Sequence, residues 1–257
     1  MIKIQRLNMD NSWYIELDSL KLLVDPWLEG AEIDYFSWFN KQWHRTPPLK
    51  YEDIPDYDLV LITQKYPDHF HHKTLIKLQP KNVMGPESIR KKVNKILPNA
   101  EFIAFNKKKK QQLFEGVTFH FLPTKRWFDP IYDAFLIDDG KESICLATHG
   151  FDIDYKYIKE MGDFSPVTLL MTPFNFYQLP AFLGGTVSPG LEGVKQLADE
   201  FNPICVVPTH DEDKHARGLV SKFAKIIKSM SKEDLRKLPW LEETYQPLNH
   251  YHLTKIS

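Results

Sequence analysis

Apolar and polar residues alternate along the first 25 positions, in the segments IKIQRL, SWYIEL and KLLV. A period of two is typical of strands with one buried face, so this pattern predicts two or three antiparallel strands. Their turns fall at residues 8–11 and 18–19. Asp25-Pro26 ends the last strand, because proline has no amide hydrogen to donate to a neighbouring strand.

Short continuous apolar runs follow and predict buried strands that alternate with helices. We expect strands at 58–63, 82–85, 101–105, 167–174 and 203–210, three more within 116–127 and 133–151, and an edge strand at 251–257. We expect helices at 72–78, 86–97, 154–161, 188–201, 215–231 and 231–238, with Ser188 or Pro189 starting the fourth and Ser231 capping the last. The alternation predicts an α/β fold. Because no linker or repeat divides the chain, we expect one domain over residues 1–257.

Two segments rich in aromatic residues are predicted to be loops. Residues 35–43 contain five aromatic side chains in nine positions. Such a segment fits a lid, a dimer contact or a lipid-surface contact, and ordinary loop packing is the alternative. Residues 174–186 fit the wall of an apolar substrate pocket to which Phe174 and Tyr177 contribute, with packing over the core as the alternative.

The composition, 42% hydrophobic and 26% charged, is that of a folded chain of 257 residues. Its 33 Lys and Arg balance 34 Asp and Glu, and the net charge of −1 gives no electrostatic footprint for nucleic acid. Cys145 and Cys205 form no metal-binding or disulfide pattern, which predicts a reducing, cytoplasmic location. We expect no signal peptide and no transmembrane segment, because the N-terminus lacks an apolar stretch and no apolar run could span a bilayer.

Candidate chemistry gathers where three predicted strands end. Asp68 and His69 follow the run at 58–63, His149 follows ICLA, and His210 follows ICVV. Taken singly, each of these residues has a structural explanation, as a helix cap or as a hydrogen-bonded histidine. Residues 211–213, which follow His210, are expected to form a solvated turn. Sites in α/β folds are built at strand ends, so the three together predict a metal or acid–base site. A carboxylate with imidazoles suits zinc, iron or manganese.

The motifs LLVDPWL, DLVLITQKYPDHF, ATHG and VVPTH, in this order, resemble those of the metallo-β-lactamase superfamily. The resemblance is greatest to the branch of the ascorbate-phosphate lactonase and N-acyl phosphatidylethanolamine phospholipase D, and it spans about residues 7–219. It implies a four-layer αββα sandwich. The His-Gly-Phe at 149–151 is also similar to a branch of the superfamily with a degenerate metal motif.

The superfamily motif His-x-His-x-Asp-His falls on residues 64–69, where the first two histidines are replaced by Gln64 and Tyr66. The next family histidine falls on Arg126. The resemblance therefore implies that the first of the family's two metal sites is lost. A fixed cation at Arg126 would repel a metal there and could replace the metal's charge toward an anionic substrate.

The ligands of the second family metal site are kept as Asp68, His69 and His210, while the carboxylate that bridges the two metals becomes His149. Asp68 would be the only formal negative charge, which disfavours two divalent ions. The resemblance thus implies one ion bound by Asp68, His69, His149 and His210, with His71 as an alternative ligand. Four protein ligands would close a tetrahedral zinc site, so catalysis would require a higher coordination number or one unbound residue.

The resemblance implies a metal-dependent hydrolase in which one ion, zinc first with iron or manganese as alternatives, activates water against an ester, lactone or phosphodiester of a small molecule. The catalytic candidates are Asp68, Arg126 and Tyr66, the substrate-binding candidates are Arg126, Trp127, Phe174 and Tyr177, and the residues expected to lie behind the ligands and orient them are Asp25, Gln64 and His71. Asp25 as a turn cap and Tyr66 as a core residue are the structural alternatives. The main alternative function is a catalytically silent ligand-binding protein, and a redox-active iron site is a third. The sequence leaves the oligomeric state open.

Overall fold

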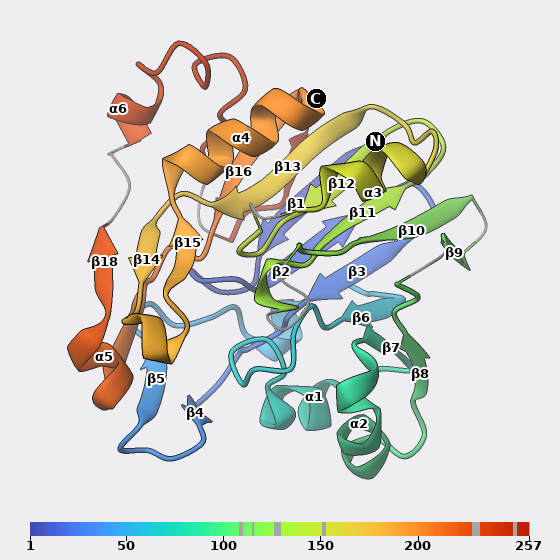
Figure 1. Cartoon of the computed structure of the whole chain (residues 1–257). Coiled ribbons are helices and arrows are strands. Elements are labelled where there is room, and N and C mark those ends of the chain that lie inside the picture. Colours follow the sequence, from blue (N-terminus) through green and yellow to red (C-terminus); the bar gives the residue numbers. More distant parts are fainter. Residues whose placement is uncertain are drawn as a thin grey trace.

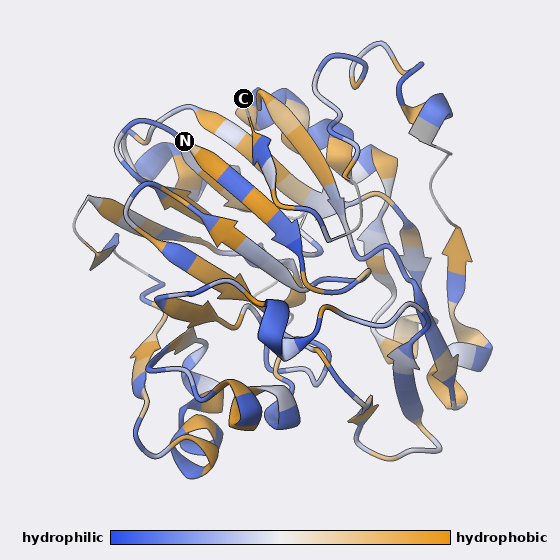
Figure 2. Cartoon of the chain, turned by 180° about the vertical axis from the view of Figure 1, so that it is seen from behind, coloured by the Kyte–Doolittle hydropathy of each residue, from blue (hydrophilic) through white to orange (hydrophobic). Residues whose placement is uncertain are grey.

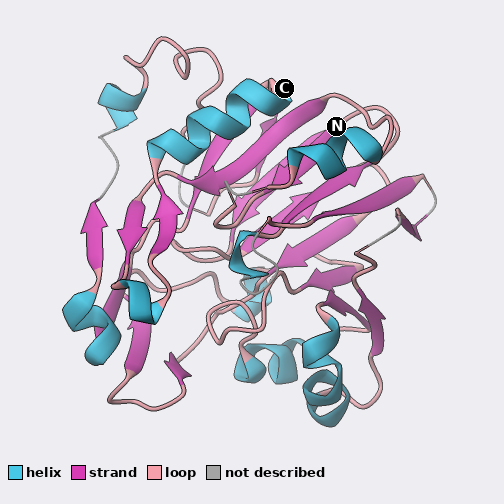
Figure 3. Ribbon diagram, viewed as in Figure 1, coloured by secondary structure: helices cyan, strands magenta, loops and turns pink. Residues whose placement is uncertain are grey.

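Two β-sheets lie face to face at the centre of the molecule, and helices cover the outer face of each sheet (Figures 1 and 3). The computed structural model describes residues 1–107, 110–114, 116–125, 130–150, 153–227, 232–248 and 251–256. The predicted α/β class and the four-layer αββα arrangement are confirmed.

The first sheet has seven strands in the order β19-β1-β2-β3-β6-β7-β8. These are β19 (Thr254–Ile256), β1 (Ile2–Arg6), β2 (Trp13–Glu16), β3 (Lys21–Val24), β6 (Leu59–Leu61), β7 (Asn82–Gly85) and β8 (Glu101–Ala104). The N-terminal strands pair antiparallel, as their alternation predicts, and β3, β6, β7 and β8 run parallel. Helices α1 (His72–Leu78) and α2 (Arg90–Ile96) bury Leu75 and Val93 against the outer face of this sheet.

The second sheet has six strands in the order β16-β13-β12-β11-β10-β9. These are β16 (Cys205–Thr209), β13 (Val167–Pro173), β12 (Ser143–Leu146), β11 (Ala134–Asp138), β10 (Val117–Leu122) and β9 (Gln111–Phe114). Strands β12, β13 and β16 are parallel. Helices α3 (Tyr155–Glu160) and α4 (Leu191–Phe201) cover its outer face through Ile158, Val194 and Leu197.

Apolar side chains from both sheets fill the space between them. Ile4 and Ile15 from the first sheet belong to the same buried cluster as Phe119, Phe135 and Met171 from the second. The strands near the N-terminus alternate in hydropathy along their length, as Figure 2 shows. Burial of one such side chain contributes roughly 1.5–3 kcal/mol, so this core fixes the sheets on which the loops at their ends are mounted.

Two small sheets lie together at one end of the sandwich, on the left of Figure 1. One contains β17 (Lys214–Arg217), β5 (Asn40–His44) and β4 (Ala31–Asp34), and the other contains β15 (Thr186–Pro189), β14 (Phe176–Gln178) and β18 (Lys225–Ile227). The remaining elements are α5 (Leu219–Phe223), α6 (Lys232–Leu235), and the 3-10 turns η1 (Tyr51–Asp53), η2 (Glu87–Ile89), η3 (Pro130–Tyr132) and η4 (Ala181–Leu183).

These small sheets correct the sequence predictions for the segments that form them. Residues 215–227 are not one helix, because residues up to Arg217 pair with β5 as strand β17 and Gly218 then turns the chain with a φ of +129°, which is not a helical conformation. The supposed aromatic loops contribute strands β5, β14 and β15. Helix α4 begins after Gly190, since Ser188 and Pro189 are the last residues of β15. The proposed cap Ser231 lies outside the described residues.

The carboxyl ends of parallel strands position the candidate residues. Asp25 follows β3, His69 follows its parallel neighbour β6, and His149 and His210 follow β12 and β16 of the second sheet. Parallel strands end at the same edge of a sheet, and the side chains from the two edges meet at one point.

Candidate metal centre

His69 is held on one side by a buried carboxylate. Its Nδ1 lies 2.7 Å from Asp25 Oδ2. Asp25 also accepts hydrogen bonds from Thr63 N at 2.7 Å, Thr63 Oγ1 at 2.5 Å and Asn11 Nδ2 at 3.0 Å. An ionised carboxylate only accepts, which matches four donors. The donors therefore place an N–H of His69 at Nδ1, and Nε2 is the nitrogen that faces the site.

His149 and His210 bring two further imidazoles to the same point. Each of the three histidines offers a ring nitrogen, and these nitrogens lie within 4.8 Å of one another. The rings of His149 and His210 have centroids 4.4 Å apart. Nδ1 of His149 and both ring nitrogens of His210 are buried without a hydrogen-bond partner. A buried polar atom left unpaired costs about 1–3 kcal/mol, so the arrangement points to a ligand for these atoms.

Asp68, the one acidic residue among the predicted ligands, lies beside His69 but is not part of the converging group of three. Its Oδ2 lies 3.7 Å from His69 Nε2, and its side chain is 22% exposed, whereas that of His69 is 1% exposed. Asp68 therefore lies at the solvent side of the buried imidazoles.

The protonation of the triad follows from burial and from the neighbouring charges. Burial opposes the charge on His69, but Asp68 and Asp25 outweigh it and raise the pKa of His69 to about 9. Burial, together with the charge of His69, lowers the pKa of His149 to about 3. Burial also lowers the pKa of His210 well below its ordinary value. His149 and His210 are thus neutral near pH 7, the state in which imidazole binds a metal.

The donor set fits one divalent ion. Three imidazoles and one carboxylate are ligand types that zinc accepts, and two ligand atoms each about 2.1 Å from a tetrahedral ion lie roughly 3.4 Å apart. The 3.7 Å between Asp68 and His69 is close to this spacing. Within the described residues no other group of three His, Cys, Asp or Glu side chains converges in this way.

Two of the site residues have left-handed backbone conformations, with φ of +46° at Asp25 and +50° at His210. For residues other than glycine this conformation costs on the order of 1 kcal/mol. Backbone and side-chain contacts hold the turn at His210, whose N–H donates to Asp10 O at 2.9 Å and whose carbonyl accepts from Asn175 Nδ2 at 3.0 Å. The fold therefore imposes these turns, as expected where side chains must be aimed at a site.

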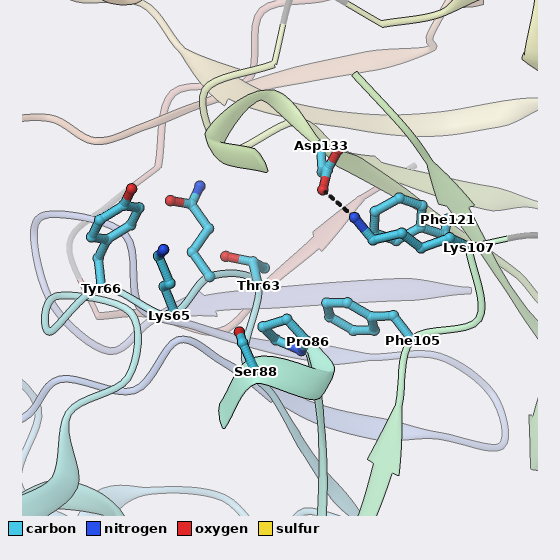
Figure 4. A pocket seen from close by; sticks show the side chains of 10 residues that line it. Thr63, Lys65, Tyr66, Pro86, Ser88, Phe105, Lys107, Phe121 and Asp133 are labelled. Carbon is cyan, nitrogen blue, oxygen red and sulfur yellow. Dashed lines mark ion pairs between the residues drawn. The ribbon is translucent and has the colours of Figure 1, made fainter. Parts of the chain in front are cut away.

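The two non-histidine positions of the motif point elsewhere. Gln64 Nε2 donates to Thr148 Oγ1 and to Ile131 O, both at 3.1 Å, and so ties the turn after β6 to the second sheet. Tyr66 and Lys65 line a small open pocket that lies beside this turn (Figure 4).

This pocket has apolar walls and cationic groups. Lys107 lies across it from Lys65, 3.5 Å from Asp133 (dashed line in Figure 4). The lining residues are Thr63, Gln64, Lys65, Tyr66, Pro86, Ser88, Phe105, Lys107, Phe121 and Asp133. Such a pocket fits a partly apolar group that carries an acceptor or an anion.

The other sequence candidates are not among the three converging histidines. His71 caps α1 by accepting from Thr74 N at 3.3 Å and is not part of the triad. Phe174 is 2% exposed and packs in the core on Tyr245, with ring centroids 5.8 Å apart. Tyr177 lies half-buried on β14. Arg126 and Trp127 are outside the described residues.

Sequence reasoning missed a buried charged group beside the centre. Lys214 Nζ lies 3.0 Å from Asp10 Oδ2, with the two side chains 8% and 2% exposed, and 3.6 Å from Glu212. Burial raises the pKa of the neighbouring Glu32, and the charge of Asp68 raises it further. The turn at 211–213 is therefore not solvated as predicted. No local signal marks these residues. Their side chains come to lie on the inner face only when β4, β5 and β17 pair into a sheet.

Comparisons with known proteins agree with this architecture. Residues 6–210 match the family model described as Beta-lactamase superfamily domain. The chain therefore belongs to the metallo-β-lactamase superfamily. None of the curated proteins compared with the chain matches it significantly. None of the helices within the described residues is long and apolar enough to cross a membrane.

Solved structures share the fold at low sequence identity. A possible metal-dependent hydrolase from Veillonella parvula is 13% identical with a TM-score of 0.67, over 99% of this chain and 98% of that one. Isothiocyanate hydrolase from Delia radicum gut bacteria is 16% identical with a TM-score of 0.66, over 99% of both chains. CmlA, a diiron β-hydroxylase from Streptomyces venezuelae, is 14% identical with a TM-score of 0.64, over 99% of this chain and 54% of that one. Because these neighbours catalyse different reactions, the fold alone does not select the chemistry.

Proposed function

We propose that this chain is a metal-dependent hydrolase with a one-metal centre formed by Asp68, His69, His149 and His210. The observation that carries the proposal is the convergence of three buried imidazoles, two of which, His149 and His210, have buried nitrogens without a hydrogen-bond partner. Asp68 lies 3.7 Å from the third, His69. An ion held there, zinc first and iron or manganese as alternatives, supplies Lewis acidity and lowers the pKa of a water toward neutrality.

The protein's own residues prepare this site for the ion. Asp25 fixes the ring of His69, so that Nε2 faces the site; because the pKa of His69 is raised to about 9, an ion would have to displace the proton on Nε2 near pH 7. Burial keeps His149 and His210 neutral. Because their pKa values are low, protons do not compete with an ion for their ring nitrogens near pH 7. Asp68, which is partly exposed, is the ligand best placed to share the site with water and substrate.

We propose that the pocket beside Tyr66 binds the substrate. Lys65 and the Tyr66 hydroxyl are the polar groups that would hold an ester, lactone or phosphodiester oxygen, while Phe105 and Phe121 would pack against its apolar part. Arg126, which the sequence places near the lost family site, is proposed to add a positive charge for a phosphate or carboxylate of the substrate. The substrate is thus a small molecule with an acyl or phosphoryl group next to an apolar part.

A ligand-binding protein without turnover is the second candidate function. It is favoured by Gln64, whose hydrogen bonds to Thr148 and Ile131 close the position where the family motif has a metal ligand. With one family metal site replaced, binding could persist after catalysis was lost.

The test uses metal-free protein, prepared with a chelator, to which zinc, manganese or iron(II) is returned. Aryl esters, lactones and aryl phosphodiesters are assayed for hydrolysis, with His149→Ala as the site variant and His252→Ala, an exposed histidine, as the control. The proposal predicts turnover restored by metal and reduced at least roughly 100-fold in the site variant alone. Metal bound to the wild type without any turnover would favour the binding protein, and turnover insensitive to chelator and to His149→Ala would overturn the proposal.

A further inference from the structure

The sheet formed by β17, β5 and β4 has its apolar face toward solvent and its polar face toward the metal centre. Glu32 and Lys214 are buried on the inner face. The next residue of β4, Ile33, is 45% exposed on the outer face, as is Trp43 of β5 at 36%. This is the reverse of the alternation expected for a small sheet over a core.

The exposed apolar side chains continue beyond this sheet onto the neighbouring tips. In the turn between β4 and β5, Tyr35, Phe36 and Trp38 are 75%, 60% and 65% exposed. Phe182 of η4 and Phe223 of α5 are 77% and 51% exposed, and their ring centroids are 6.5 Å apart. These tips project from the same end of the molecule (Figure 1). Within the described residues this end holds nine of the thirteen large exposed hydrophobic side chains. Besides the five just named, these are Ile33, Trp43, Ile226 and Ile227.

The tips are attached to one another by backbone contacts. Leu219 N donates to Trp38 O at 3.0 Å and Val220 N donates to Phe39 O at 3.0 Å, which joins α5 to the β4–β5 turn. The rings of Phe36 and Trp38 stack with centroids 5.7 Å apart. The apolar side chains are therefore presented as one surface, which we call the aromatic end.

The charge of this surface is one-sided. Segments 35–46, 174–190 and 214–227 of this end contain six Lys and Arg and no Asp or Glu. Lys214 is buried in its pair with Asp10, and Arg45 lies 4.0 Å from Asp213, so the cations left for the surface are Lys41, Arg217, Lys222 and Lys225. The acidic residues of β4, Glu32 and Asp34, alternate with Ile33 and so belong to the inner face. Lys41 of β5 and Arg217 of β17 lie opposite each other in the register. Lys41 is two residues from Trp43 along β5, so these side chains share the outer face of the sheet with Trp43. Lys222 and Lys225 add charge next to Phe223.

Exposed aromatic rings next to cationic side chains indicate what the aromatic end binds. Tryptophan and tyrosine with nearby lysine and arginine suit the interface of an anionic bilayer, where rings enter the headgroup region and cations meet lipid phosphates. A second copy of the chain is less suited, because a two-fold contact through this face would bring like charges together. We propose that the aromatic end docks on the surface of an anionic lipid membrane. The inference stands on exposure and charge and does not depend on the proposed catalytic activity.

The test is co-sedimentation with phosphatidylcholine vesicles, with or without phosphatidylglycerol, at low and high salt. The wild type is expected to bind the anionic vesicles, and less so at high salt. Lys41→Gln with Arg217→Gln should weaken partitioning by roughly five-fold per charge. Phe36→Ser with Trp38→Ser should abolish it, since these side chains would enter the interface.

Ile76→Ser with Leu253→Ser is the matched control, because both side chains are exposed elsewhere, at 47% and 48%. It should bind as the wild type does. All of the exchanged residues lie on the surface, so circular dichroism should show unchanged folding. Absence of binding to anionic vesicles, or equal loss in the control, would overturn the proposal. A stable dimer in solution that the Phe36 and Trp38 exchanges dissociate would also overturn it in favour of self-association.

Discussion

Replacing Asp25 by asparagine is expected to weaken metal binding at His69 while leaving the fold in place. Asparagine has nearly the same size, and it tolerates the left-handed φ of +46° found here. What changes is hydrogen bonding. Thr63, Asn11 and His69 all donate to the carboxylate, and the amide of asparagine adds donors of its own.

The size of both effects follows from this geometry. At least one buried donor loses its acceptor, which should reduce the free energy of unfolding by about 1–3 kcal/mol. The ring of His69 loses the carboxylate that keeps the proton on Nδ1, and the loss of such a partner typically costs 10–100-fold in metal affinity. This corresponds to roughly 1.4–2.7 kcal/mol of binding free energy.

The two quantities are measured separately. Zinc affinity is obtained by competition with a chromophoric chelator, and stability by urea unfolding with chelator present. Asp154→Asn is the control, because Asp154 caps α3 at the surface and asparagine caps equally well. If Asp25→Asn kept the wild-type zinc affinity in a folded protein, the assignment of His69 as an oriented ligand would be wrong.

Three further predictions concern stability. Lys214→Ala should lower the free energy of unfolding by about 3–5 kcal/mol, because Asp10 would remain as a buried charge, and a loss below about 1 kcal/mol in urea unfolding would refute this. Gly218→Ala should lower the melting temperature, since the φ of Gly218 is +129° and the added Cβ would lie 2.5 Å from Phe39 O. Gly116→Ala, at a position with open space around it, should lower the melting temperature less. Burial lowers the pKa of His44 from 6.5 to about 4, so the unfolded chain takes up this proton first on acidification. Stability should therefore fall between about pH 6.5 and 4 by roughly 2–3 kcal/mol from this residue, and His44→Phe should flatten that part of the pH profile; equal slopes for wild type and variant would contradict it.

Local patterns were sufficient for most of the fold. The period of two in residues 1–25 predicts β1 to β3, and α1 begins and ends where the sequence predicts. The helix prediction for residues 215–231 was wrong because helical periodicity is a local signal, whereas the pairing of residues 214–217 with β5 depends on a contact between distant parts of the chain.

The residues of the candidate site also fall into those that a local pattern predicts and those that it does not. His69, His149 and His210 were found because each directly follows a buried strand, and strand ends meet in space. The buried pair of Lys214 and Asp10 could not be found, because it depends on which strands pair with β5 and on which face of that sheet turns inward. Separation along the sequence hides such contacts until the register is known.

Metal stoichiometry tests the central claim most directly. Untagged protein is incubated with excess zinc, freed of unbound metal and analysed for its elements, next to the His69→Ala, His210→Ala double variant and the His252→Ala control. The account predicts about one equivalent of zinc in the wild type and the control and none in the double variant. No zinc in the wild type would contradict the metal centre itself, and two equivalents would contradict the one-ion ligand set of Asp68, His69, His149 and His210.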